Sequence, residues 1–333
     1  MLNRASLRLW SIGGGKGGIG KSILTLGLGL HLARRGRQVI LIDADLGGAN
    51  LHTLLGLRQP PVTMEDFFQK YVARLEDTII PTSFGGLGLI CGADNVLGSA
   101  NITYPQKIRL LKEMEALPAD FVLLDLGAGT SFNILDLFNH SPGKIVLCTP
   151  QTTSLQSAYG FIKAALYRRL SREFAKHQEL LRLLDRMNRR EVDAPWQALP
   201  ELLERLKGFT PEIYWCVRRV LEDFHLFLVV NMVQQEGEEK SPEIVQTVCA
   251  EFLRLRPQIL GTLDYDPVVE QVVNRMEPRL LLQGKSRAVA GLERMAQRLL
   301  VLGRLAGGYV PEPQAEPDKT PRPALKVLCG QAT

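Results

Sequence analysis

The residues best suited to chemistry form a glycine-rich run near the N-terminus. Within it, Gly15 to Ser22 match the phosphate-binding pattern G-x-x-x-x-G-K-[ST]. Its glycines let backbone N–H groups converge on phosphate oxygens. Lys21 is expected to reach the β- and γ-phosphates, and the Ser22 hydroxyl to ligate Mg²⁺. The predicted nucleotide contacts in this run are Gly15, Lys16, Gly17, Gly18, Ile19, Gly20, Lys21, Ser22 and Ile23.

Further carboxylates end two later apolar runs. Asp43 and Asp45 follow the run RQVILI, and Asp125 ends the run FVLLD. Asp43 suits an outer-shell Mg²⁺ contact, and Asp45 suits orienting or deprotonating an attacking water. Asp125 suits contact with Mg²⁺, directly or through water. Together with Ser22, these residues predict a magnesium site beside the phosphates.

An amide ends another apolar run, LFLVVN. The Asn231 side chain carries both a donor and an acceptor, so it can pair with adenine. The residue type alone is a weak signal for adenine, and it favours a structural role.

The elements that must position these groups alternate along the chain. Apolar residues 7–12 predict a buried strand, and residues 23–35 have helical spacing before Gly36. Similar strand-like runs occupy residues 37–44, 86–91, 120–125, 144–148, 226–231 and 258–263. Apolar strands between helices predict an α/β fold, with a mostly parallel sheet of about seven strands and helices on both faces. Ligands bind beyond the carboxyl ends of such strands, where the chemical residues above are expected to meet.

A family resemblance sharpens this prediction. The loop GKGGIGKS resembles the deviant Walker A motif of MinD/ParA P-loop ATPases. The segments DADLGGANLHTLLGL, LLDLGAGTSFNILDLF, TPQTTSLQSAYGFIK, VVNMV and LDYDPVVEQVVNRMEPRL look like parts of FlhG/YlxH-type flagellum site-determining proteins. The resemblance covers roughly residues 1–165 and 224–305.

The resemblance implies an ATP-dependent homodimer with ATP and Mg²⁺ as cofactors. In that family the additional lysine, here Lys16, reaches the partner's phosphates and neutralises charge during phosphoryl transfer. It implies catalytic roles for Lys16, Lys21 and Asp45, and an adenine contact from Asn231. The region around Asp266 and Pro267 is implied to line the base pocket.

The predicted organisation is one ATPase domain over residues 1–306 and a disordered, proline-rich tail over 307–333. A helical insertion is expected at about 166–222, with residues 166–190 forming one arginine-rich amphipathic helix. The insertion fits a lid or buttress on the sheet, a partner or dimer surface, or a weak nucleic-acid contact. Residues 292–305 are expected to pack on the sheet rather than on a membrane.

Composition narrows the setting. The 333 residues are 45% hydrophobic with a net charge of +5, and no apolar run reaches the roughly 18 residues of a membrane span. The first predicted strand leaves no room for a signal peptide. Five dispersed cysteines without a CxxC pattern favour reduced thiols and a cytoplasmic location. Peripheral contact with the inner membrane or with DNA stays open.

The function predicted from these observations is an ATPase switch that controls spatial position, with flagellum number or placement as the leading process. The alternatives are a septum-site ATPase and a DNA- or cargo-partition ATPase. A regulatory or cargo protein is expected as partner, with no identity implied. A distant alternative is an ATP-driven metallocluster carrier or reductase, which needs cysteines near the switch loops or in a CxxC pair.

Overall fold

The computed structural model describes residues 8–45, 48–92, 102–178, 180–182, 184, 198–283 and 286–305. In this part of the chain, eight strands form one sheet in the order β3-β4-β2-β5-β1-β6-β7-β8. The strands are β1 (Leu9–Gly13), β2 (Val39–Ala44), β3 (Ile80–Pro81), β4 (Leu87–Ile90), β5 (Phe121–Leu126), β6 (Gly143–Cys148), β7 (Phe227–Val233) and β8 (Gln258–Asp264). The α/β fold with a mostly parallel sheet is confirmed.

The strand that the sequence did not predict is β3. It spans two residues and pairs antiparallel with β4, whereas the other neighbouring strands pair in parallel. Two residues are too few to show a periodic pattern, and the proline limits the strand to a sheet edge. It lies at the edge farthest from β8.

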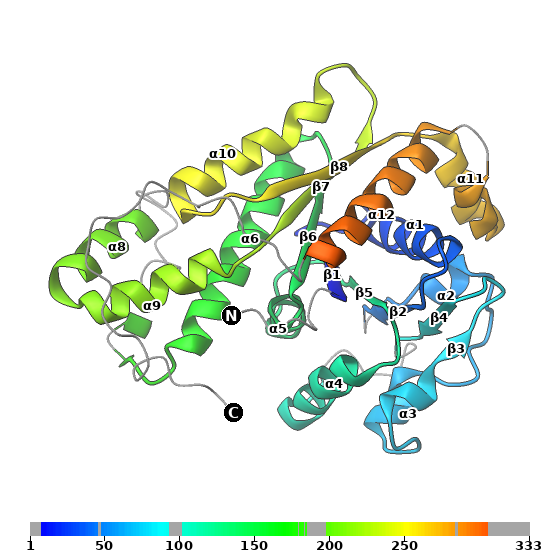
Figure 1. Cartoon of the computed structure of the whole chain (residues 1–333), viewed down its shortest axis with the longest axis horizontal. Coiled ribbons are helices and arrows are strands. Elements are labelled where there is room, and N and C mark those ends of the chain that lie inside the picture. The colour runs from blue at the N-terminus through cyan, green and yellow to red at the C-terminus, as the bar shows by residue number, and fades with distance from the viewer. Residues whose placement is uncertain are drawn as a thin grey trace.

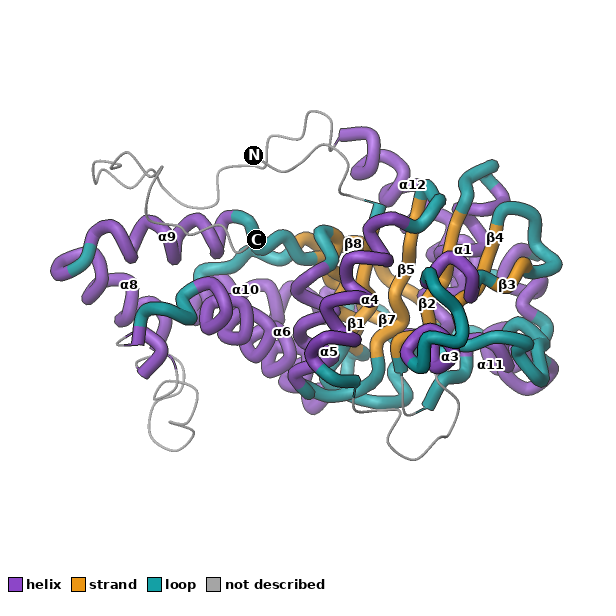
Figure 2. The backbone as a smooth tube through the Cα atoms, turned by 90° about the horizontal axis from the view of Figure 1, so that it is seen from below, coloured by secondary structure: helices purple, strands orange, loops and turns teal. Residues whose placement is uncertain are grey.

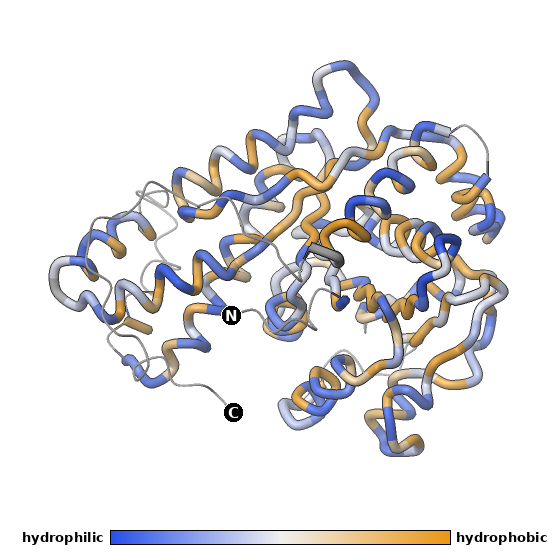
Figure 3. The backbone as a smooth tube through the Cα atoms, in the orientation of Figure 1, coloured by the Kyte–Doolittle hydropathy of each residue, from blue (hydrophilic) through white to orange (hydrophobic). Residues whose placement is uncertain are grey.

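Helices cover both faces of the sheet (Figure 2). Apolar side chains of the strands alternate between two buried clusters. Leu124 and Val146 belong to one, and Leu123 and Ile145 to the other. The strands are therefore apolar on both faces. Figure 3 shows that hydrophobic residues predominate along the strands at the centre of the molecule.

One cluster packs against helices α3 (Met64–Phe68), α4 (Tyr104–Ala116), α5 (Phe132–His140), α6 (Thr152–Glu173), α8 (Ala198–Phe209), α9 (Pro211–Glu222) and α10 (Ser241–Leu253). The other packs against α1 (Lys21–Arg34), α2 (Leu51–Leu54), α11 (Pro267–Arg275) and α12 (Arg287–Leu305). Short 3₁₀ turns occupy Leu75–Thr78, Glu238–Lys240 and Pro278–Leu282.

The prediction of one helix over residues 166–190 is wrong in its boundaries. Helix α6 begins at Thr152 and ends at Glu173, and a turn at residues 174–176 follows before helix resumes in the described residues of 178–184. Phe174 is buried and its ring packs near His177, which holds the turn in the core. Apolar spacing continues across this turn, so the sequence pattern did not reveal it.

Helices α6, α8, α9 and α10 extend beyond the sheet at one end of the molecule (Figure 1). Arg168 and Arg172 of α6 both form ion pairs with the buried carboxylate of Asp136 on α5. These two arginines therefore help to fix α6 against its neighbour. The domain boundaries themselves stay a prediction, and the tail at 307–333 lies outside the described residues.

Helix α12 packs on the sheet, as predicted for residues 292–305. Leu292, Met295 and Leu299 are buried between it, α1 and β8. None of the helices in the described ranges is long and apolar enough to cross a membrane.

Candidate functional site

The glycine loop connects β1 to α1 at the carboxyl edge of the sheet. Gly20 has a φ of 92°, in the left-handed region that favours glycine. A Cβ there would also lie 2.3 Å from Asn231 Nδ2. Gly15 is similarly confined, because its Cβ would lie 2.3 Å from the Ser157 carbonyl oxygen of α6. The loop is thus fixed between β7 and α6.

Lys21 and Lys16 of this loop have different surroundings. Lys21 is buried, and its Nζ donates to the Lys16 carbonyl oxygen at 3.2 Å. Burial lowers the pKa of Lys21, while the carboxylates of Asp125 and Asp45 oppose that shift. Lys16 Nζ instead donates to Thr153 Oγ1 of α6 at 2.7 Å.

Two buried carboxylates lie side by side at the ends of β2 and β5. Asp43 and Asp125 are register partners on these parallel strands and are 1% and 2% exposed. Burial raises the pKa of Asp43 to about 6. Burial and the nearby Asp43 carboxylate raise the pKa of Asp125 to about 7. A concentration of negative charge this deep favours a cation beside it.

The surroundings of Asp125 fit Mg²⁺. The Ser22 side chain hydrogen bonds to Asp125, and Thr25 Oγ1 donates to Asp125 Oδ1 at 3.4 Å. Mg²⁺ prefers such oxygen ligands and takes one or two carboxylates together with phosphates and water. In the described ranges, no group of three or more acidic, histidine or cysteine side chains is placed to hold a metal. Phosphate and water would therefore have to complete the coordination.

Asp43 also organises the loop after β2. Its Oδ2 accepts from the backbone N–H groups of Asn50 at 2.8 Å and Leu51 at 2.9 Å, where α2 begins. Its Oδ1 accepts from the Asp45 N–H at 3.3 Å. The side chain of Asp45 lies beside the loop after β5, since a Cβ at Gly127 would be 3.0 Å from Asp45 Oδ1. Both loops after the acidic strands therefore meet at Asp45.

The Asn231 amide supports the phosphate loop from β7. Its Nδ2 donates to the Ile19 carbonyl oxygen at 2.8 Å. Because a carbonyl only accepts, this contact fixes which end of the amide faces the loop. Asn231 therefore keeps its oxygen and its second N–H for a base, and the donor–acceptor pairing expected from the sequence stays a prediction.

A pocket of about 820 Å³ runs from the phosphate loop toward β8 and α11. The predicted residues that line it are Gly17, Gly18, Gly20, Lys21, Ser22, Ile23, Asp45, Asn231 and Asp266. The predicted residues that do not line it are Gly15, Lys16, Ile19, Asp43, Asp125 and Pro267. All of these except Pro267 have the contacts described above with the phosphate loop or with the residues that pack against it. Pro267 is the first residue of α11.

Several lining residues were not predicted from the sequence. They are Asn50, Thr53, Leu54, Leu126, Ala128, Met232, Asp264, Tyr265, Val269, Glu270, Val273 and Asn274. They come from α2 and the residue before it, from the last residues of β5, β7 and β8 or the loops after β5 and β8, and from α11. These segments carry no contiguous nucleotide motif. The sequence signal that could have indicated these α11 residues was the helical spacing of Val269 and Val273, with Glu270 between them. The same spacing is equally typical of a surface helix without a ligand.

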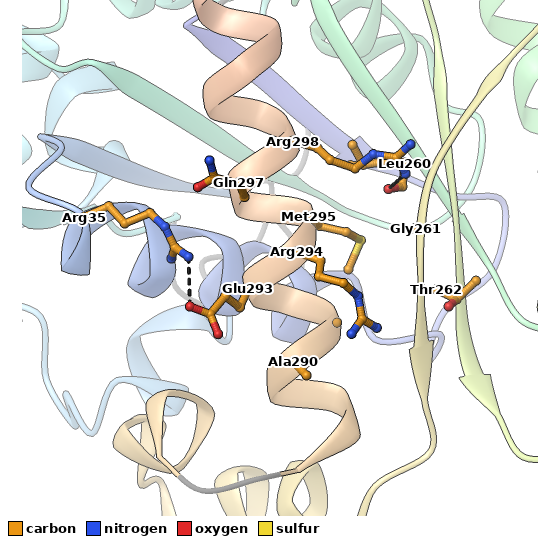
Figure 4. Close-up of a pocket in the computed structure, with 11 residues that line it drawn as sticks. Arg35, Leu260, Gly261, Thr262, Ala290, Glu293, Arg294, Met295, Gln297 and Arg298 are labelled. Carbon is orange, nitrogen blue, oxygen red and sulfur yellow. Dashed lines mark hydrogen bonds and ion pairs between the residues drawn. The ribbon is translucent and has the colours of Figure 1, made fainter.

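A second hollow, of about 730 Å³, lies over α12 near β8 (Figure 4). Arg35 donates to Glu293 at 2.8 Å across it, and Arg298 donates to the Ile259 carbonyl oxygen at 3.2 Å. These contacts join α12 to α1 and to the edge strand. We interpret this hollow as a packing feature rather than a ligand site.

Comparisons with known proteins agree with this architecture. The family model described as "ParA: NUBPL iron-transfer P-loop NTPase" matches residues 8–166. The septum site-determining protein MinD of Helicobacter pylori is 28% identical over 75% of this chain and 90% of that protein. The antiactivator FleN of Pseudomonas aeruginosa is 30% identical over 46% of this chain and 54% of that protein.

A solved structure of MinD from Pyrococcus horikoshii, complexed with Mg-ADP, has a TM-score of 0.57 and 19% identity. The structural match covers 91% of this chain and 99% of the Pyrococcus horikoshii chain. The chain spans about half the length of several curated relatives that it matches. The matched region covers 46% of the putative septum site-determining protein MinD of Oltmannsiellopsis viridis and 54% of that of Chlorella vulgaris. These matches show that residues 8–166 are similar to the ParA family model, and that the chain is similar to MinD and FleN proteins.

Proposed function

We propose that this chain binds Mg-ATP and hydrolyses it to ADP and phosphate. The observation that carries the proposal is the location of Lys21 and Ser22 beside the buried Asp43–Asp125 pair, at the mouth of a nucleotide-sized pocket. Similarity to the P-loop NTPase family model and the Mg-ADP complex of a structural neighbour support ATP and Mg²⁺ as the cofactors.

Each residue has a role that its surroundings allow. Lys21 holds the β- and γ-phosphates, while Ser22 and Asp125 hold Mg²⁺, with Asp43 in its outer shell. Bound Mg²⁺ supplies positive charge that offsets the charge developing on the transferred phosphoryl group. Asp45 orients or deprotonates the attacking water from a loop that touches Gly127.

Two protomers share the nucleotides in this proposal. Lys16 does not line its own pocket, and its Nζ hydrogen bonds only with Thr153 among the described contacts of that atom. A lysine directed away from its own phosphates is available to a second protomer. There it acts as a charge donor in trans, in the manner of an arginine finger.

The test compares nucleotide binding with phosphate release. Lys16→Ala is expected to bind ATP as the unchanged protein does and to lose hydrolysis. Lys176→Ala, which changes an exposed lysine after α6, is the matched control and should retain both. Normal turnover by Lys16→Ala would overturn the trans role. Absence of ATP binding by the unchanged protein would overturn the whole proposal.

The proposed output is positional control, with flagellum number or placement as the process. The segments that resemble FlhG/YlxH-type flagellum site-determining proteins support it. A septum-site role is the second candidate, because MinD of Helicobacter pylori matches along more of the chain. Deleting the gene and counting flagella and anucleate minicells separates the two: altered flagellar number supports the first role, and minicells support the second.

The proposed setting is the cytoplasm, with a peripheral contact at the inner membrane and a regulatory or cargo protein as partner.

An iron-carrying role, suggested by the name of the matching family model, has less support. The four cysteines in the described ranges are all buried, and burial raises the pKa of Cys148 and Cys249 to about 12. Thiols in this state are poor metal ligands.

A further inference from the structure

Three acidic residues lie at the end of the pocket away from the phosphate loop: Asp264, Asp266 and Glu270. Asp266 caps α11 by accepting from the Val268 N–H at 3.0 Å, and it also accepts from the Ser286 hydroxyl. Glu270 accepts from the Tyr265 hydroxyl. The carboxylates of Asp266 and Glu270 therefore already have partners within the protein.

Asp264 differs from these two neighbours. It is half-buried at the carboxyl end of β8, and its carboxylate has no hydrogen bond or ion pair with the described residues. On β8, Asp264 is the register partner of Val233 on the adjacent strand β7. Val233 follows Asn231 by two residues, so Asp264 and Asn231 lie near the same end of the sheet. A carboxylate that lines the pocket and has no partner among these residues can accept a hydrogen bond from a ligand.

The two strand ends offer the base acceptors. Asn231 donates one Nδ2 hydrogen to the Ile19 carbonyl oxygen and keeps its amide oxygen as an acceptor, and Asp264 adds a carboxylate. Adenine carries an amino group with two hydrogens at C6, whereas guanine carries an acceptor oxygen at the same position. An adenine amino group can satisfy an acceptor on each strand, while the guanine oxygen would face a negative charge.

We propose that Asp264 accepts a hydrogen bond from the exocyclic amino group of adenine and thereby selects adenine over guanine nucleotides. This inference rests on the proposed nucleotide-binding function and names a specificity residue within it. A carboxylate can also pair with the N1–H and amino group of guanine in a different base orientation, and the experiment distinguishes that outcome.

The experiment measures binding of three diphosphates to the full chain with Mg²⁺, so that hydrolysis does not interfere. The ligands are ADP, GDP and purine riboside 5′-diphosphate, which has hydrogen in place of the amino group. The unchanged protein should bind ADP about tenfold to a hundredfold tighter than the purine riboside analogue, the range for a hydrogen bond to a charged group. In Asp264→Ala the two ligands should bind within about threefold of each other.

Asp264→Asn preserves the size of the side chain and can donate to the guanine oxygen. It should lower the preference for ADP over GDP by about tenfold or more. Glu270→Gln is the control for charge, because it removes a negative charge at the same end of the pocket. It should change the affinities for ADP and the purine riboside analogue by the same factor.

An ADP-to-analogue ratio that is equal in the unchanged protein and in Asp264→Ala would overturn the inference while leaving nucleotide binding intact. A preference of the unchanged protein for GDP would also overturn it and would indicate pairing with guanine. Binding of none of the three ligands would overturn the proposed function together with this inference.

Discussion

The two ends of the nucleotide pocket are built differently. The phosphate end comes from one contiguous loop, and its Lys21 is buried near the carboxylates of Asp125 and Asp45. The base end is assembled from β7, β8 and α11, and Tyr265 and Val273 there are each 47% exposed. The contrast suggests that the phosphate end supplies most of the affinity and the base end supplies the selection among nucleotides.

Removing Lys21 should have the largest effect. Lys21→Ala deletes the buried cation of the phosphate loop and leaves Asp125 and Asp45 without their nearby positive charge. We expect affinity for ADP and ATP to fall by about a hundredfold or more, because a truncated buried charge pair costs several kcal/mol. Calorimetric titration measures it. A loss smaller than that caused by changes at the base end would reverse the comparison.

The pH dependence of stability tests the buried carboxylates. The pKa values of Asp43 and Asp125 are raised to about 6 and about 7 in the folded chain. Between about pH 4 and 7 the folded state therefore binds more protons than the unfolded state, and the free energy of unfolding falls as pH rises. The loss should be about 2–4 kcal/mol for the pair.

Urea unfolding at pH 5 and pH 8, without nucleotide or Mg²⁺, measures that loss. Asp125→Asn should remove most of the pH dependence and raise stability at pH 8. The exposed change Glu251→Gln on α10 serves as the control and should leave the profile unchanged. Stability that rises between pH 5 and pH 8 in the unchanged protein would contradict the expectation.

Asn231 connects the two ends, because its Nδ2 holds the phosphate loop while its oxygen remains for the base. Asn231→Ala should weaken ADP binding by about tenfold, the scale of one buried hydrogen bond. Asn231→Asp should weaken it more, since a carboxylate would face the Ile19 carbonyl oxygen. Equal affinities for the two variants would show that the loop contact is dispensable for binding.

The smallest effect is expected at Thr153. Thr153→Val keeps the shape of the side chain and removes the hydroxyl that accepts from Lys16 at 2.7 Å. Freed from that contact, Lys16 should engage a second protomer more readily, and ATP-dependent dimerisation should tighten by about threefold. Analytical ultracentrifugation measures the dimer constant. Weaker dimerisation would instead indicate that Thr153 positions Lys16 for the partner.

The sequence alone determined the phosphate end and the class of fold. Gly15 to Ser22 carry their chemistry in consecutive residues, and strand-like apolar runs between helices specify a parallel sheet with both faces covered. Local spacing was sufficient because these features depend on neighbours in the chain. The two-residue strand β3 and the turn after Glu173 escaped this reasoning, since neither interrupts a periodic pattern.

Only the tertiary structure decided the pairings between distant segments. The register of β2 against β5 places Asp43 beside Asp125, and burial together with this proximity raises the pKa of Asp125. The approach of β7 to the loop engages one end of the Asn231 amide with Ile19. Asp266 caps α11, whereas Asp264 has no hydrogen bond or ion pair with the residues that the structure describes. Such facts depend on which strands become neighbours, and no local pattern of residue types encodes that.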